Sequence, residues 1–217
     1  MQSLRASTVW FLNLVDAWAC GQGHWQRPPR EGLGVRAACY RLCCCIWIRV
    51  GEDVMSIALC IKQSLELPEF VVRCYLEGLT DADLLVRPLE GMNHIAWQLG
   101  HLIGSEHGHI ETLFPGTMPA LPDGFCDRHT RATSGSDAPS DFLAKSDYLK
   151  LMASQREGTL HVLLSLSDQQ LQEEAPESIR YLGPTVGCVF TGEASHWMMH
   201  AGQWAVIRRK LGHSPLF

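Results

Sequence analysis

The chain has 217 residues, of which 46% are hydrophobic and 19% are charged, and its formal net charge is −5. Because no run of about eighteen consecutive apolar residues occurs, we expect no membrane-spanning helix, and the acidic balance gives no reason to expect nucleic-acid binding. The nine cysteines are odd in number and clumped, which favours reduced thiols in a cytoplasmic protein over a disulfide framework.

Residues 1–54 differ in composition from the rest of the chain. They contain six arginines, no lysine, five of the nine cysteines and four of the seven tryptophans. One interpretation is a secretory signal that ends before Cys20, although Asp16 interrupts its apolar run. A second is a lipidated cluster at residues 43–45. We expect instead a poorly structured extension outside the fold, with Met55 as the native start and the upstream part as a gene-start artefact.

Two helices are predicted in the sequence that follows. The first runs from Ser56 to about Gly78, and Pro68 is expected to bend it or to restart it. The second helix has Asn93 as its N-cap and stops at Pro115. Both carry apolar residues at helical spacing on one side.

Residues 114–139 are rich in Pro, Gly, Ser and Thr, which predicts a long loop over one end of the fold. Ser140 is predicted to cap a third helix that runs to about Ser167. A fourth helix is predicted from about Val186 to Leu211, with basic residues in its last turn. No segment alternates with a period of two, so the pattern predicts an all-α four-helix bundle with a long connection between helices two and three.

The fourth helix carries two histidines four residues apart, His196 and His200. Such residues share one helix face with Cβ atoms about 5–6 Å apart, so they can chelate one ion. They belong to a stripe with apolar ends and a polar middle: Val189, Glu193, His196, His200, Gln203, Ile207 and Leu211. The alternative is a pair of neutral, hydrogen-bonded core imidazoles. Each buried polar group without a partner costs about 1–3 kcal/mol, and a metal would supply several partners at once.

A catalytic metal site needs a third protein ligand. The second and third helices offer five candidates: His94, His101, His107, His109 and His161. Periodicity does not choose among them, because His101 lies on a polar face whereas Glu106 and His109 lie nearer the apolar stripe. Cys126 and His129 form a C-x-x-H in the long loop, but no matching second pair is nearby, so we expect them to be loop residues without a role.

Three motifs resemble the DinB-like (DinB/YfiT) superfamily of metalloenzymes. They are L-T-D-A-D-L-L-V-R-P, then N-H-I-A-W-Q-L-G-H-L-I-G-S-E, and finally P-T-V-G through H-W-M-M-H-A-G-Q-W-A-V-I-R-R-K-L-G. The resemblance covers residues 55–217 and implies a four-helix bundle that binds a divalent metal, Zn²⁺ first and Ni²⁺ as the alternative. Carried over by motif, the three metal ligands are His101, His196 and His200.

Glu193 and Gln203 lie one turn either side of the two histidines on the stripe, so we expect them to support the ligands. Glu106 is either a base or supporting group near the metal or an ordinary helix carboxylate. The resemblance also bears on the chemistry. Family members with assigned activity are thiol-dependent: transferases that join low-molecular-weight thiols to electrophiles, and a mycothiol-dependent isomerase. We therefore expect a metal-dependent transferase or hydrolase that acts on a small molecule, with a thiol cosubstrate, as a homodimer.

The alternative is a non-enzymatic metal-binding or stress-response bundle that works through a partner. An enzyme needs an accessible pocket and an open coordination position, whereas a structural metal site is closed.

Overall fold

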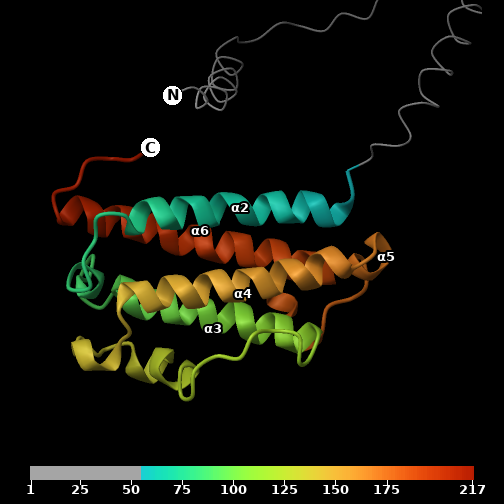
Figure 1. The fold of residues 1–217 in the computed structure, drawn as a ribbon, viewed down its shortest axis with the longest axis horizontal. Coiled ribbons are helices and arrows are strands. Elements are labelled where there is room, and N and C mark those ends of the chain that lie inside the picture. Colours follow the sequence, from blue (N-terminus) through green and yellow to red (C-terminus); the bar gives the residue numbers. More distant parts are fainter. Residues whose placement is uncertain (1–54) are drawn as a thin grey trace, which may run out of the picture. The chain divides into compact units, whose positions relative to one another are not determined.

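The computed structural model describes residues 55–217, and four long α-helices dominate this part of the chain (Figure 1). They are α2 (Ile57–Leu76), α3 (Ile95–Leu113), α4 (Lys145–Ser165) and α6 (Val186–Lys210). No strand forms within residues 55–217, so the all-α prediction is confirmed. No helix in this part is long and apolar enough to cross a membrane. The interpretations of residues 1–54 lie outside the described residues.

The four helices pack side by side, with α2 along α6 and with α3 against both α4 and α6 (Figure 1). The core contains two large apolar clusters. The first lies toward the C-terminal end of α6 and includes Leu99 and Trp204. The second lies toward the N-terminal end of α6 and includes Ile110 and Phe190. Charged residues occupy the level between them, and they are described with the site below.

Helix α2 runs without interruption through Pro68. The side chain of Ser56 caps it by accepting a hydrogen bond from the backbone nitrogen of Leu59 at 3.2 Å. The restart that the sequence suggested does not occur. Pro68 belongs to a buried stripe with helical spacing, Ala58, Ile61, Leu65, Pro68, Val72 and Leu76. Burial of this stripe against α6 offsets the backbone hydrogen bond that the proline cannot make.

The starts of two helices differ from the sequence prediction. The N-cap of α3 is His94 rather than Asn93, because Nδ1 of His94 accepts from the backbone nitrogen of Trp97 at 3.1 Å. Helix α4 begins at Lys145, five residues after the predicted cap, Ser140. Residues 139–141 form a separate 3₁₀ turn there. A carboxylate from elsewhere replaces the missing cap, since Oδ1 of Asp81 accepts from the backbone nitrogen of Lys145 at 2.7 Å.

The long connection between α3 and α4 folds back along α3. Its short helix η3 (Cys126–His129) packs on α3, where His129 is buried and bonded to the hydroxyl of Tyr148 at 2.8 Å. A Cβ added to Gly100 would lie 2.1 Å from the ring of His129. Gly100 therefore makes room for the ring, and His129 is a packing residue. Because η3 covers it, α3 buries more than one face.

The connection between α4 and α6 contains two short helices, α5 (Asp168–Leu171) and η6 (Glu177–Leu182). Ser167 and Gln170 form a capping box at the start of α5. Helix η6 packs against α6 and carries Tyr181 to the side of α3. The connections before and after α4 thus both run along the bundle helices.

Candidate metal centre

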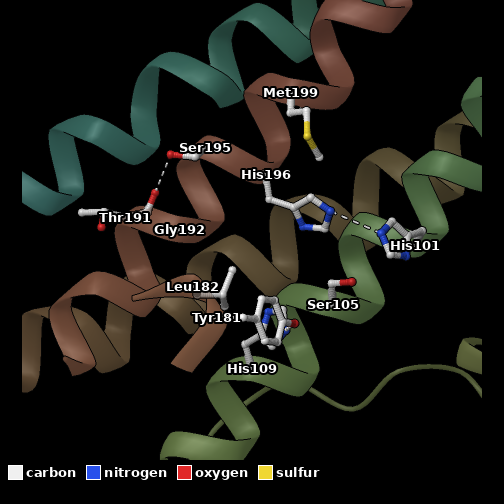
Figure 2. Close-up of a pocket in the computed structure, with 10 residues that line it drawn as sticks. All are labelled: His101, Ser105, His109, Tyr181, Leu182, Thr191, Gly192, Ser195, His196 and Met199. Atoms are coloured by element: carbon white, nitrogen blue, oxygen red, sulfur yellow. Dashed lines mark hydrogen bonds between the residues drawn. The ribbon is translucent and has the colours of Figure 1, made fainter. Parts of the chain in front are cut away.

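Three histidine side chains from α3 and α6 converge at one point: His101, His196 and His200. The nitrogen atoms that they can offer to an ion all lie within 4.8 Å of one another. The Nε2 atoms of His101 and His196 are 3.2 Å apart (Figure 2). Two nitrogens bound to a tetrahedral zinc at about 2.0–2.1 Å lie roughly 3.3 Å apart. The spacing therefore fits a single ion held by these three residues.

Gln98 fixes the protonation of His200. Its side-chain oxygen accepts from the indole nitrogen of Trp204 at 2.8 Å and lies 2.9 Å from Nδ1 of His200. Its amide nitrogen donates to the backbone oxygen of Asn93 at 2.6 Å. An indole nitrogen only donates and a carbonyl oxygen only accepts, so the amide cannot be the other way round. Nδ1 of His200 therefore carries the proton, and the lone pair of Nε2 is free to bind a metal.

Gln203 is hydrogen-bonded to Gln98 and not to any of the three histidines. Its side-chain oxygen accepts from the amide nitrogen of Gln98 at 3.1 Å. Sequence reasoning proposed Gln203 as the supporting residue and missed Gln98, which makes the direct contact with His200. The signal for Gln98 was available, because it stands one helical turn before His101 on the same polar face of α3.

The other two histidines are held by packing. The ring of His101 stacks on the indole of Trp97, with ring centroids 5.0 Å apart and planes 11° from parallel. Nδ1 of His196 is buried and has no hydrogen-bond partner within residues 55–217. A pair of ordinary core imidazoles would satisfy such a nitrogen, because leaving it unmet costs about 1–3 kcal/mol. His196 therefore lacks the hydrogen bond at Nδ1 that Gln98 gives to His200.

All three imidazoles are held in the neutral form that metal ligands require. Burial lowers the pKa of His101, and a proton on nearby His109 would lower it further. Burial, followed by the charges of the neighbouring histidines, lowers the pKa of His196 to about 3. Burial and His101 lower the pKa of His200 to about 4. At neutral pH the group carries no charge of its own and repels no cation.

Glu106 belongs to a polar layer that we define as Glu106, Arg156, Thr159 and Trp197. Its carboxylate accepts from the guanidinium of Arg156 at 3.0 Å, from the hydroxyl of Thr159 at 2.7 Å and from the indole nitrogen of Trp197 at 2.8 Å. Both charged residues are buried. Because both carboxylate oxygens are engaged by donors of the core, the structure gives Glu106 a packing environment and not a place in the cavity.

Glu193 contacts His109 and none of the three converging histidines. Its carboxylate pairs with Nδ1 of His109, and Nε2 of His109 is 2.6 Å from the hydroxyl of Tyr181. Figure 2 shows the ring of Tyr181 beside His109, across the cavity from Ser195. Sequence reasoning named Glu193 but missed this arrangement, because Tyr181 lies in a connector without periodicity.

A cavity of about 570 Å³ joins the two groups of residues. Its walls come from α3, η6 and α6 (Figure 2). The lining residues are His101, Ser105, His109, Tyr181, Leu182, Thr191, Gly192, Ser195, His196 and Met199. Two of the three converging histidines therefore face space that is large enough for a small molecule.

The remaining histidine candidates lie elsewhere. His94 caps α3 and contacts the backbone oxygen of Ser136 at 3.0 Å. His107 contacts the side chain of Gln155 at 3.1 Å, and His161 is exposed on α4. The structure thus places one of the five candidates from the second and third helices, His101, beside His196 and His200.

The family model of the DinB superfamily matches residues 71–204, a range that contains His101, His196 and His200. No curated protein matches the chain.

Proposed function

The chain belongs to the DinB superfamily, and we propose that it is a divalent-metal-dependent enzyme that transfers a low-molecular-weight thiol to a small electrophile. Family membership and the histidine triad together suggest a divalent metal. The observation that carries the enzyme proposal is the position of His101 and His196 on the wall of the 570 Å³ cavity. A structural metal site would be closed by protein on all sides.

The ligand set suits zinc first and nickel second. Three neutral imidazoles add no charge to a divalent ion, and imidazole nitrogen is a preferred ligand for both metals. When bound, such an ion supplies Lewis-acid chemistry and lowers the pKa of a thiol or water beside it. The residues of the chain hold the imidazoles neutral by burial and orient His200 through Gln98.

The cavity supports a small substrate. A volume of about 570 Å³ is within the roughly 300–1,000 Å³ of ordinary small-molecule sites. Ser105, Thr191 and Ser195 give it hydroxyl groups, and Leu182 and Met199 give it apolar surface. Hydroxyl groups can position a polar thiol compound, and the apolar surface can receive the carbon skeleton of an electrophile.

Elemental analysis of the purified full-length chain tests the metal. After repletion with zinc, the wild-type protein should hold about one zinc per chain, and His200→Ala should hold little. His161→Ala is the matched control, because His161 is exposed and lies outside the cavity. Wild-type protein without stoichiometric metal would refute the proposal at its first step.

Thiol consumption tests the reaction. The zinc-loaded protein is mixed with 2-mercaptoethanol and an aryl halide, and free thiol is followed over time. Turnover that is lost in His200→Ala supports a transferase. Stoichiometric zinc without turnover over a panel of small thiols would instead favour the non-enzymatic metal-binding bundle.

A further inference from the structure

A buried histidine–glutamate pair and the hydroxyl group of a largely exposed tyrosine are linked in the wall of the cavity, opposite the histidine triad. Glu193 is fully buried, whereas Tyr181 is 75% exposed. His109 stands between them and contacts both, through Nδ1 and Nε2 respectively. The chain of contacts thus runs from the interior of the bundle to the cavity that His101 and His196 also line.

The proton positions in this chain of contacts follow from its chemistry. Burial, with the nearby charge of Glu193, raises the pKa of Tyr181, so its hydroxyl keeps its proton at neutral pH. That hydroxyl can donate to Nε2 of His109, which lies 2.6 Å away. In a neutral imidazole whose Nε2 accepts, Nδ1 carries the hydrogen and donates to Glu193. The order of hydroxyl, imidazole and carboxylate is the one that activates a hydroxyl group in hydrolase triads.

Hydrogen bonds satisfy the buried carboxylate only in part, and the charge of Arg156 also lowers its pKa. Oε2 of Glu193 is buried without a hydrogen-bond partner in the described part of the chain. The nearby guanidinium of Arg156 is hydrogen-bonded to Glu106 instead. Burial raises the pKa of Glu193, and its hydrogen bond with His109 opposes that rise. A proton added to His109 would bring the pair from a charge of −1 to neutrality.

We propose that Tyr181, His109 and Glu193 form a proton relay that accepts the proton of a small-molecule thiol bound in the cavity. This inference rests on the proposed function for the position of the thiol beside the three histidines. Tyr181 would contact the thiol, and His109 and Glu193 would act through Tyr181.

Protons and charges balance in this transfer. The S–H bond breaks, its electron pair stays on sulfur, and a new bond forms between that proton and Oη of Tyr181. The original proton of Tyr181 moves from Oη to Nε2 of His109. His109 then carries a hydrogen on each ring nitrogen and faces the carboxylate of Glu193. The thiol changes from neutral to −1, while the relay changes from −1 to neutral.

Calorimetry can measure whether the proton of the thiol stays on the protein or is released to the buffer. The full-length chain is loaded with zinc, its zinc content is measured, and 2-mercaptoethanol is titrated into it at pH 7.5 in phosphate and in Tris. These buffers differ in ionisation enthalpy, so the difference in heat gives the protons released per bound thiol. We expect a value near zero for the wild type, because His109 keeps the proton. We expect about one for His109→Gln.

His107→Gln is the matched control for that measurement, since His107 lies two residues away on α3 and outside the cavity. It should release as few protons as the wild type. Equal proton release by His109→Gln and the wild type would overturn the relay, and so would the absence of binding heat with the thiol. Wild-type protein that takes up no zinc fails earlier, in the elemental analysis, and refutes the proposed function together with the inference.

A second variant keeps the test independent of the folding of His109→Gln. Tyr181→Phe removes one hydroxyl group from a side chain that is largely exposed. With cobalt(II) in place of zinc, the visible absorption reports how fast 2-mercaptoethanol binds. Removal of Tyr181 should slow binding by roughly 100-fold, the lower end of what a positioned proton acceptor contributes. Tyr75→Phe, outside the cavity, should bind at the wild-type rate. Equal rates for Tyr181→Phe and the wild type would refute the role of the hydroxyl.

Discussion

Gln98 and His200 are joined across the interface of α3 and α6 by a hydrogen bond of 2.9 Å in which the histidine donates. This bond determines which ring nitrogen of His200 can face the other two histidines. A histidine ligand whose second nitrogen is held in this way is both oriented and more basic. Gln98 is therefore as much a part of the proposed metal centre as the ligands are.

Replacement of Gln98 by leucine should weaken metal binding. The change leaves the Nδ1–H of His200 and the indole N–H of Trp204 without an acceptor, so we expect metal affinity to fall about 10- to 100-fold. Competition with a chelating dye measures this affinity. Gln155→Leu is the matched control, because Gln155 is an equally buried glutamine that bonds His107 and Pro119. Equal affinity in the two variants would show that Gln98 has no special role.

Gly100→Ala should destabilise the protein. Its Cβ would fall 2.1 Å from the ring of His129, and overpacking of this kind typically costs about 1–3 kcal/mol. Gly108→Ala, in the same helix, has nothing within 4 Å of the added atom and should gain up to about 1 kcal/mol from helix propensity. Urea unfolding of the two variants measures both changes. A neutral Gly100→Ala would mean that η3 does not pack on α3 in this way.

Glu106→Gln should lower the free energy of unfolding by about 3–5 kcal/mol, because it leaves the buried guanidinium of Arg156 without its counter-charge. Glu66→Gln breaks the exposed ion pair with Lys62 and should cost less than about 1 kcal/mol. Denaturant titration compares the two. If both variants lose the same small amount, the polar layer is not a buried ion pair in solution.

The metal-free protein should lose stability as the pH falls below about 6.5. In the folded state the pKa is about 3 for His196 and about 4 for His200, against 6.5 for an unperturbed histidine. Between these limits the unfolded chain binds protons that the folded chain does not, so stability is complete above pH 6.5 and declines toward pH 4. Burial lowers the pKa of His94, His101 and His129 as well, which acts in the same direction.

Urea unfolding at pH 7.5 and at pH 5 measures this decline. The double variant His196→Gln/His200→Gln should show a smaller difference between the two pH values than the wild type. It should still show some difference, because the three other buried histidines remain. A double variant with the full wild-type decline would contradict the contribution of the pair.

The sequence predicted the helices well because apolar residues recur at helical spacing along each of them. It predicted their starts less well. Ser140 has the chemistry of an N-cap, but α4 begins five residues later, where Asp81 from the connection between α2 and α3 accepts its first N–H. Caps supplied from a distant segment leave no local pattern. His94 takes the N-cap position of α3 that was expected for Asn93, because its imidazole nitrogen can also accept the hydrogen bond of a cap.

The residues of the candidate site were likewise predicted only in part from the sequence. The inward direction of His196 and His200 followed from the stripe on α6, whereas the choice of His101 needed the family resemblance. Periodicity failed on α3 because η3 buries the opposite face, so that polar and apolar sides are both inside. Tyr181 was beyond reach for another reason: its place in the cavity depends on the path of η6, and that path follows from packing on α6 rather than from any repeat.

The polar layer around Glu106 has a consequence for the alignment of the bundle. Apolar clusters alone would tolerate a slide of one helix past another by a turn, about 5.4 Å, with little change in buried area. Such a slide would separate Glu106 on α3 from Arg156 on α4 and from the indole of Trp197 on α6, and would bury unpaired charges. The layer therefore fixes the alignment of α3, α4 and α6 along their axes. It holds His101 level with His196 through residues that never touch an ion.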